Sequence, residues 1–392
     1  MIRFLTSGES HGPAEVAILE GIPAGLPITK ADIQADLDKR KGGYGRGGRG
    51  KIESDEVEIL SGIRHGQTLG SPIALMVRNQ DFANWTDRMS VGPTENTSKK
   101  ETQPRPGHAD LAGVLKYGFD DVRNVLERAS ARETIMRVAI GAVCRKLLNE
   151  VGIEIASHTV GIGSVTLESR KWKVESENKF LEIVKKIYEV DPDIRCIDKD
   201  TSEKMKEEIR QATIQKDTLG GVIEIIAIGV PIGLGSHVHW DRKLDGQLAQ
   251  AFISIPSVKA VEVGQGFTGA GKKGSEIQDE IFFEEGSYTR HTNRLGGIEG
   301  GITNGEAIVC RVYHKPISTL NNPLNTVNID TKAPEKALVE RSDVCVVPRA
   351  GIISESMMAY VLSNALVEKF GGDSLSELKR NYESYQEWLK TV

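Results

Sequence analysis

Residues 40–51 read Arg-Lys-Gly-Gly-Tyr-Gly-Arg-Gly-Gly-Arg-Gly-Lys, and this segment constrains the fold more than any other. Its six glycines permit left-handed backbone conformations and let main-chain N–H groups approach a ligand closely. Its three arginines present planar forks of donors that match carboxylate and phosphate oxygens. The segment is therefore typical of a loop that wraps an anion. A flexible solvated linker and an RGG-type RNA-binding segment stay open as alternatives from these residues alone.

The overall composition favours a small anionic ligand over a nucleic acid. The 392-residue chain has a net charge of −5, and only 5% of its residues are aromatic. Proteins that bind nucleic acid through phosphates usually carry a basic field over the whole domain. The length suffices for one large or two ordinary domains. Because no break in composition divides the chain, we expect a single catalytic domain over residues 1–392.

The cysteines and the apolar segments indicate a cytoplasmic protein. Cys144, Cys196, Cys310 and Cys345 lie far apart without a C-x-x-C pair, so neither a zinc site nor a disulfide framework is expected. The apolar run at the N-terminus is too short for a signal peptide. No stretch approaches 18 uninterrupted apolar residues, so no membrane span is expected.

Periodicity predicts a mixture of strands and helices. Thr29 should cap a helix that buries Ile33 and Leu37, and Ser130 with Glu133 forms a capping box for the clearest helix. We expect residues 79–107 to form an excursion from the fold or a lid. Further strands are expected at 2–5, 16–19, 51–60, 73–77, 153–167, 222–228, 307–313 and 344–347, and further helices at 172–190, 201–215, 353–369 and after Ser374.

Two histidines lie in turns that could project them toward a ligand. His11 lies between Gly8 and Gly12 just after a predicted strand, and His108 lies in a stiff Pro-Gly turn three residues after Arg105. Each one alone is more often an ordinary turn histidine. A helix N-terminus flanked by Arg128 and Arg132 is a natural anion site. If the five turns at 8–12, 40–51, 105–110, 128–133 and 341–343 converge, they form one pocket for an anion-rich substrate; spacing does not prove that convergence.

Three other patterns in the sequence resemble known kinds of binding site. His237 and His239 would share a face in a strand, but no carboxylate or cysteine has matching spacing for a metal. Residues 266–273 nearly spell a Walker A loop, yet Lys273 stands where a magnesium-binding hydroxyl is needed, which argues against an NTPase. The glycine-rich segment 294–305 could approach a flat ring, and no G-x-G-x-x-G fingerprint follows a strand, which argues against a Rossmann site.

Six motifs, in order along nearly the whole chain, resemble chorismate synthase. They are Gly-Glu-Ser-His-Gly at 8–12, Gly-Arg-Gly-Gly-Arg-Gly-Lys-Ile-Glu at 45–53, Arg-Pro-Gly-His-Ala-Asp at 105–110, Arg-Ala-Ser-Ala-Arg-Glu-Thr at 128–134, Gly-Gly-Ile-Glu-Gly-Gly-Ile-Thr-Asn-Gly at 296–305 and Lys-Pro-Ile-Ser-Thr at 315–319. Each motif is weak alone, but the ordered set is specific. Ala129 departs from the family pattern, in which many members carry a serine, and its missing hydroxyl puts one flavin hydrogen bond in doubt.

The resemblance implies a reaction and a fold. Members convert 5-enolpyruvylshikimate 3-phosphate to chorismate and phosphate by an anti-1,4-elimination that needs reduced FMN, the last step of the shikimate pathway. Some members reduce their flavin with NADPH, and the sequence leaves open whether this chain does. The family fold is a single α+β domain with a helical layer sandwiched between antiparallel β-sheets, usually assembled as a homotetramer.

The resemblance also implies roles for single residues. His11 is expected to donate a proton to the phosphate, His108 to influence the protonation of the reduced flavin, and Asp343 to assist proton removal through the flavin N5. The residues expected to hold the substrate are Ser10, Arg40, Arg46, Arg49, Arg105 and Arg132. Those expected to contact FMN are Arg128, Ala129, Ser130, Pro256, Ser257, Gly300, Lys315, Pro316, Ile317, Ser318, Thr319 and Arg341.

Overall fold

The structure, a computed structural model, describes all residues except 46–54, 94–99, 168–183, 185, 285 and 341. Arg46, Arg49 and Arg341 lie outside the described residues, as does most of the helix predicted at 172–190. One layer is a four-stranded antiparallel sheet of order β1-β2-β6-β3. Its strands are β1 (Arg3–Ser7), β2 (Ala14–Glu20), β6 (Ile73–Arg78) and β3 (Val57–Ser61).

A second antiparallel sheet forms the opposite layer, in the order β10-β15-β9-β7-β8. Its strands are β10 (Val258–Val263), β15 (Ile308–His314), β9 (Gly221–Ile228), β7 (Glu154–Ile162) and β8 (Val165–Thr166). Two-stranded pairs are formed by β4 (Ile63–Arg64) and β5 (Gln67–Thr68), β11 (Ile281–Glu284) and β12 (Ser287–Arg290), β13 (Ile298–Glu299) and β14 (Ile302–Thr303), and β16 (Asn325–Val327) and β17 (Pro334–Lys336).

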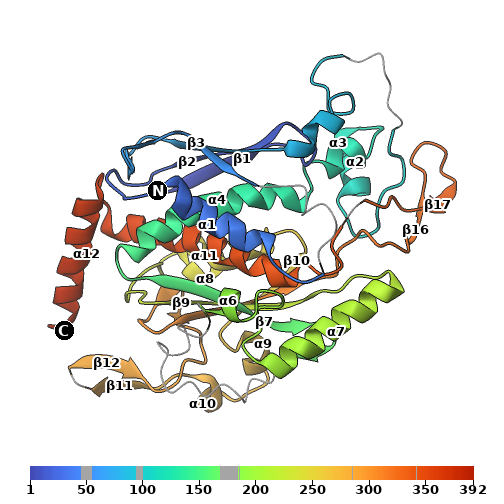
Figure 1. Ribbon diagram of the computed structural model, residues 1–392. Coiled ribbons are helices and arrows are strands. Elements are labelled where there is room, and N and C mark those ends of the chain that lie inside the picture. The colour runs from blue at the N-terminus through green and yellow to red at the C-terminus, as the bar shows by residue number, and fades with distance from the viewer. Residues whose placement is uncertain (46–54, 94–99, 168–183, 185, 285, 341) are drawn as a thin grey trace.

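In the part of the chain that the structure describes, four helices lie between the two sheets (Figure 1). Helices α1 (Lys30–Lys41) and α4 (Thr134–Asn149) pack on the first sheet, and α11 (Val347–Phe370) and α8 (Leu244–Ile253) pack on the second. This arrangement confirms the predicted α+β fold with a helical layer between antiparallel sheets. The remaining helices are α2 (Asp110–Tyr117), α3 (Arg123–Leu126), α6 (Ile187–Val190), α7 (Lys199–Gln215), α9 (Gly266–Gly269), α10 (Gly274–Ile277) and α12 (Leu375–Leu389), with 3-10 turns η2 (Gln80–Asn84), η3 (Ala131–Glu133) and η5 (Trp240–Arg242).

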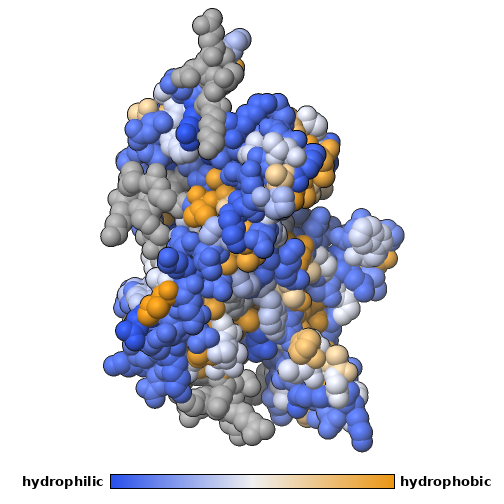
Figure 2. Space-filling view, turned by 90° about the vertical axis from the view of Figure 1, so that its right-hand side faces the viewer, coloured by the Kyte–Doolittle hydropathy of each residue, from blue (hydrophilic) through white to orange (hydrophobic). Residues whose placement is uncertain are grey.

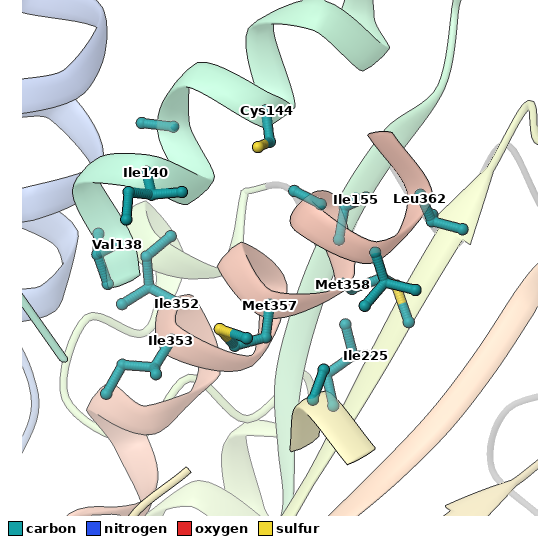
Figure 3. Close-up of a cluster of buried hydrophobic side chains, with 14 of the residues drawn as sticks. Val138, Ile140, Cys144, Ile155, Ile225, Ile352, Ile353, Met357, Met358 and Leu362 are labelled. Atoms are coloured by element: carbon teal, nitrogen blue, oxygen red, sulfur yellow. The ribbon is translucent and has the colours of Figure 1, made fainter. Parts of the chain in front are cut away.

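Helix α11 carries the centre of the hydrophobic core. It is long and apolar enough to cross a membrane by length and composition, but 89% of its most apolar window is buried inside the protein, which identifies it as a core helix. Figure 3 shows its side chains packed between α4 and the second sheet. On the face drawn in Figure 2, by contrast, apolar residues are scattered among mostly hydrophilic ones.

Several local predictions hold, and two need correction. Thr29 accepts a hydrogen bond from the Asp32 amide and caps α1 as expected. The Ser130 hydroxyl does cap a turn, but that turn is η3, and α4 begins only at Thr134. The strand predicted at 344–347 is wrong: these residues lead directly into α11, because Pro348 at the start of that helix favours helix initiation over strand pairing.

A buried ionic network fixes the end of α1, from which Arg40 reaches the interior. Arg145 of α4 donates to Asp36 of α1 at 2.9 Å and to Glu355 of α11 at 2.8 Å. Glu355 also accepts a hydrogen bond from the Tyr188 hydroxyl. Because each partner comes from a different element, the network holds α1, α4 and α11 in one relative position.

The four cysteines are free and buried. Burial raises the pKa of Cys144, Cys310 and Cys345 to about 12, so these thiols stay protonated at neutral pH. They are small apolar core residues in this fold.

Candidate active site

A cavity of about 540 Å³ gathers turns that are far apart in sequence. Its volume lies in the range of small-molecule and cofactor sites. The predicted residues that line it are Ser10, His11, Arg40, Arg105, His108, Ala129, Ser130, Arg132, Pro256, Ser257, Lys315, Ile317, Ser318, Thr319 and Asp343. The convergence that spacing alone left open is therefore present in the fold.

Three described residues of the predicted set do not line this cavity. The Arg128 side chain is 43% exposed and donates to the main-chain carbonyls of Thr6 and Gly8. Gly300 forms the β13–β14 turn, where its φ of +60° suits a glycine. Pro316 is also absent from the lining, although its neighbours on both sides belong to it.

His11 is held on two sides. Its Nδ1 lies 2.9 Å from Glu127 Oε1, and its main-chain N–H donates to Glu127 Oε2 at 2.8 Å. Its imidazole stacks on the indole of Trp85, with ring centroids 3.7 Å apart and planes inclined by 27°. The side chain is buried, so this orientation belongs to the folded protein and not to a mobile surface histidine.

Glu127 is ionised in this environment. Arg123 Nη1 donates to Glu127 Oε1 at 2.7 Å, and Arg123 also contacts Glu101 and Glu340. Burial opposes ionisation, but hydrogen bonds and charge from His11 and Arg123 outweigh it and hold the pKa of Glu127 below its ordinary value. A carboxylate that accepts from Nδ1 requires that nitrogen to carry a hydrogen, which leaves Nε2 of His11 for exchange with a ligand.

His108 is held by a second carboxylate. Asp110, which has no exposed side-chain surface, contacts His108 Nδ1 and accepts from Arg105 Nε at 2.8 Å. Burial opposes ionisation of Asp110, but hydrogen bonds from His108 and Arg105 prevail and keep its pKa far below the usual range. Arg105 donates further to Thr319 Oγ1 at 3.0 Å, so this group links two of the predicted segments.

Two buried arginines form the cationic side of the cavity. Arg40 Nη2 donates to the Ala131 carbonyl and to Thr134 Oγ1, each at 3.0 Å, at the start of α4. Asp55 lies 3.4 Å from Arg40 Nη1 and 3.7 Å from Arg132 Nη1. One carboxylate therefore stands between two guanidinium groups, which leaves a net positive charge to attract an anion.

Another part of the lining combines lysines, hydroxyls and apolar side chains. Lys315 Nζ donates to the Gly107 carbonyl at 2.9 Å and to Ser318 Oγ at 3.0 Å. Burial and the nearby charge of Lys259 lower the pKa of Lys315. The apolar lining residues are Leu126, Ile253, Ile255, Pro256, Val258, Ile317, Val346 and Ile353.

A strained turn lies in this part of the lining. Ser257 adopts φ of +72°, a left-handed conformation that is uncommon outside glycine and that clusters at functional sites. Its hydroxyl lies 2.9 Å from His314 Nδ1, and burial lowers the pKa of His314 to about 4, so that imidazole is neutral at pH 7. A neutral buried histidine can orient the Ser257 hydroxyl without adding charge to the cavity.

Several residues of the site lie outside the sequence motifs that predict it. Trp85 and Glu127 support His11, Asp55 separates two arginines, and Arg349 pairs with Asp343 at 2.8 Å. Only Glu127 had an available signal, because it directly precedes the quoted motif at 128–134. The others become neighbours of the site only through the fold.

The rejected motifs stay apart from the cavity. His237 and His239 are exposed and lie in a loop before η5, not in a strand, so they do not share a strand face. Among the described residues, no group of three or more His, Cys, Asp or Glu side chains could hold a metal. Residues 266–273 belong to α9 and the loop after it, outside the cavity lining.

The fold and the cavity are those of an enzyme that acts on a small molecule. Comparison with known proteins makes this class specific, since the chorismate synthase family profile matches residues 2–367. The chain belongs to the chorismate synthase family, a family of shikimate-pathway lyases.

Individual relatives match over their full length. The chorismate synthase of Solibacter usitatus is 50% identical over 395 residues and covers 100% of both chains. That of Symbiobacterium thermophilum is 52% identical and covers 99% of each. A crystal structure of a chorismate synthase superposes with a TM-score of 0.80 at 42% identity, covering 100% of this chain and 99% of the other.

Proposed function

We propose that the cavity binds 5-enolpyruvylshikimate 3-phosphate beside reduced FMN and converts it to chorismate and phosphate by anti-1,4-elimination. The observation that carries this proposal is the convergence of His11, His108 and Asp343 on one cavity, from turns separated by about a hundred residues or more. Acid–base groups that line one space suit a reaction in which a proton and a phosphate leave the same molecule.

The cationic side is proposed to hold the substrate. Arg40 and Arg132 are buried, so their attraction for phosphate and carboxylate is screened less than at the surface. Ser10 and Arg105 complete the proposed set among the described residues, and Arg46 and Arg49 are proposed from the glycine-rich segment. Preorganised cations of this kind stabilise the charge that develops on the departing phosphate.

The apolar and hydroxyl-bearing part of the lining is proposed to hold the flavin. Apolar side chains around Ile255 and Ile317 offer a surface for a flat ring, while Ser257, Ser318 and Thr319 offer hydroxyls to its polar edge. Lys315 supplies a cation for a phosphate group. Bound there, reduced FMN would supply electron density to the C–O bond that breaks. Ala129, Ser130, Pro256 and Pro316 are proposed as further contacts, and Arg128, Gly300 and Arg341 are proposed from the family pattern alone.

Each acid–base group has a proposed task. His11, with Nδ1 held by Glu127, presents Nε2 to donate a proton to the phosphate oxygen as the C–O bond breaks. His108, held by Asp110, controls protonation on the flavin side of the cavity. Asp343, paired with Arg349, assists removal of the proton that the substrate loses.

Assembly and context are proposed with the function. A single catalytic domain over residues 1–392 is supported by one main core cluster that runs from Ile2 to Leu378. A cytoplasmic homotetramer is proposed from the family pattern, and NADPH is proposed as a candidate source of electrons for the flavin.

Anaerobic turnover tests the proposal. The purified chain should release phosphate and chorismate from the enolpyruvyl substrate in the presence of reduced FMN, and oxidised FMN alone should support neither product. Equal rates with both flavin states, or no product with reduced FMN, would reject the proposed function.

A further inference from the structure

We propose that Glu127 and Trp85 are positioning residues that hold His11 in one tautomer and one orientation toward the cavity. The inference rests on the proposed role of His11 as a proton donor. It concerns two side chains outside the quoted motifs, one at the end of α3 and one just after η2.

Glu127 fixes which nitrogen of His11 faces the ligand. Its carboxylate contacts both the main-chain N–H of His11, at 2.8 Å, and the ring Nδ1, at 2.9 Å. Because an ionised carboxylate accepts but does not donate, Nδ1 keeps its hydrogen in both protonation states of the ring. Only Nε2 is left to gain and lose a proton, so the exchangeable proton is always on the atom that can reach a ligand.

Trp85 fixes the plane of the imidazole. The two rings overlap at 3.7 Å, and the indole Nε1 donates to Asp81 Oδ2 at 3.1 Å, which holds the tryptophan in turn. The Asn79 side chain donates to the carbonyl of Gly12 at 2.9 Å. The start of the 79–107 excursion is thus tied to the turn that carries His11.

Some charged groups around His11 favour its protonated ring, and others favour its neutral ring. Glu127 favours the protonated ring, whereas Arg123, 2.7 Å from Glu127, offsets part of that attraction. Arg123 is itself shared with Glu101 and Glu340, and Arg88 lies 5.6 Å from the Trp85 ring. Arg40, Arg105, Arg132 and His108 line the same cavity and favour the neutral ring. Among the described residues, Glu127 is the carboxylate that contacts the imidazole.

The proposed proton transfer conserves atoms and electrons. As the C–O bond breaks, its electron pair passes to the phosphate oxygen, and the Nε2 proton of imidazolium His11 moves to that oxygen. Neutral His11 remains, with its Nδ1 hydrogen on Glu127, and takes one proton from solvent before the next turnover. In this scheme a turnover therefore starts only from the protonated ring of His11.

Fluorescence of Trp85 tests the pairing without any chemistry, because a protonated imidazole in contact with an indole quenches its emission. The reporter protein is full-length chain with Trp172→Phe, Trp240→Phe and Trp388→Phe, which leaves Trp85 as the only tryptophan. We expect its emission to fall with decreasing pH in one titration, and His11→Gln in the same background to abolish that titration.

Glu127→Gln is the decisive variant. Removal of the negative charge should move the midpoint of the fluorescence titration to lower pH by about one unit. The alkaline limb of kcat, measured with reduced FMN in the otherwise wild-type chain, should move by the same amount. Glu127→Asp keeps the negative charge, so its titration midpoint should lie close to that of the protein with Glu127. If Glu127→Gln folds poorly, this variant separates the effect of charge from the effect of side-chain shape.

Trp85 is tested separately through turnover. Trp85→Leu should lower kcat roughly 3–10-fold with KM unchanged, which is the worth of one aromatic pair, and Trp85→Phe should restore most of the loss. A fluorescence titration that persists in His11→Gln, or a midpoint unchanged in Glu127→Gln, would overturn the proposed positioning. A midpoint that moves while the kcat profile stays would keep the pairing and reject His11 as the proton donor.

Discussion

The carboxylate of Asp110 lies directly against Nδ1 of His108 and has no exposed surface of its own. Asp110→Asn removes the charge that also holds Arg105, so we expect a loss of about 3 kcal/mol in the free energy of unfolding, as for other broken buried ion pairs. Urea denaturation at pH 7 measures it. A loss below about 1 kcal/mol would show that the group is not a structural unit.

The pH dependence of that loss follows from the lowered pKa of Asp110. A carboxyl with a depressed folded-state pKa stabilises the protein above its unfolded value, about pH 4, and this stabilisation is lost as pH falls toward the folded value. The difference between wild type and Asp110→Asn should therefore shrink below about pH 4. A difference that stays constant between pH 7 and pH 3 would contradict the assignment.

Glu15 should show the opposite dependence. Burial raises its pKa to about 7, despite the opposing attraction of Arg132 and Arg128. Because the folded state holds this proton more tightly than the unfolded state does, its contribution falls as pH rises from about 4.5 to about 7. Glu15→Gln should therefore gain about 2 kcal/mol over wild type at pH 8 and little at pH 5. Unfolding curves that separate the two proteins equally at both pH values would refute this.

Both histidines should be needed for turnover. His11→Ala and His108→Ala are each expected to lower kcat by roughly 10²–10⁴-fold, the usual size of a general acid–base contribution. Anaerobic single-turnover assays with reduced FMN measure the chemical step. A loss below threefold in both variants would reject the proton-transfer roles.

The contact between α4 and α11 offers a test of the fold. A Cβ on Gly141 would lie 2.2 Å from Ser356 Cβ, so Gly141→Ala should destabilise the protein by about 2 kcal/mol even though alanine favours helices. Gly246 of α8 is the matched control, because the atom nearest to a Cβ added there, the carbonyl oxygen of Trp240, would lie 3.9 Å away. Gly246→Ala should leave stability unchanged or raise it by about 0.5 kcal/mol. Two alanine variants of equal stability would contradict the packing.

Local chemistry explains which parts of the fold could be predicted. The side-chain caps of Thr29 and Ser130 act within a few residues, so their turns were predictable from sequence. The strand expected at 344–347 is absent because Val347 already belongs to α11, and periodicity does not separate a short apolar run that leads into a helix from a strand.

The residues of the site likewise fall into those that the sequence predicts and those that only the fold brings together. His11 and His108 were found because glycine and proline mark their turns. Trp85 and Asp55 were missed, because a tryptophan or an aspartate gains a role here only through contacts with residues far along the chain. The family resemblance supplied the roles, and the fold supplied the distances.

A crystal structure with oxidised FMN and 5-enolpyruvylshikimate 3-phosphate tests whether one cavity holds both molecules. We expect both molecules to occupy the one cavity. The flavin ring should lie against the part of the lining that contains Ile255 and Ile317, and the substrate phosphate should lie within hydrogen-bonding distance of His11 Nε2 and close to Arg132. A substrate phosphate outside this cavity, or one that contacts neither His11 nor Arg132, would contradict this expectation.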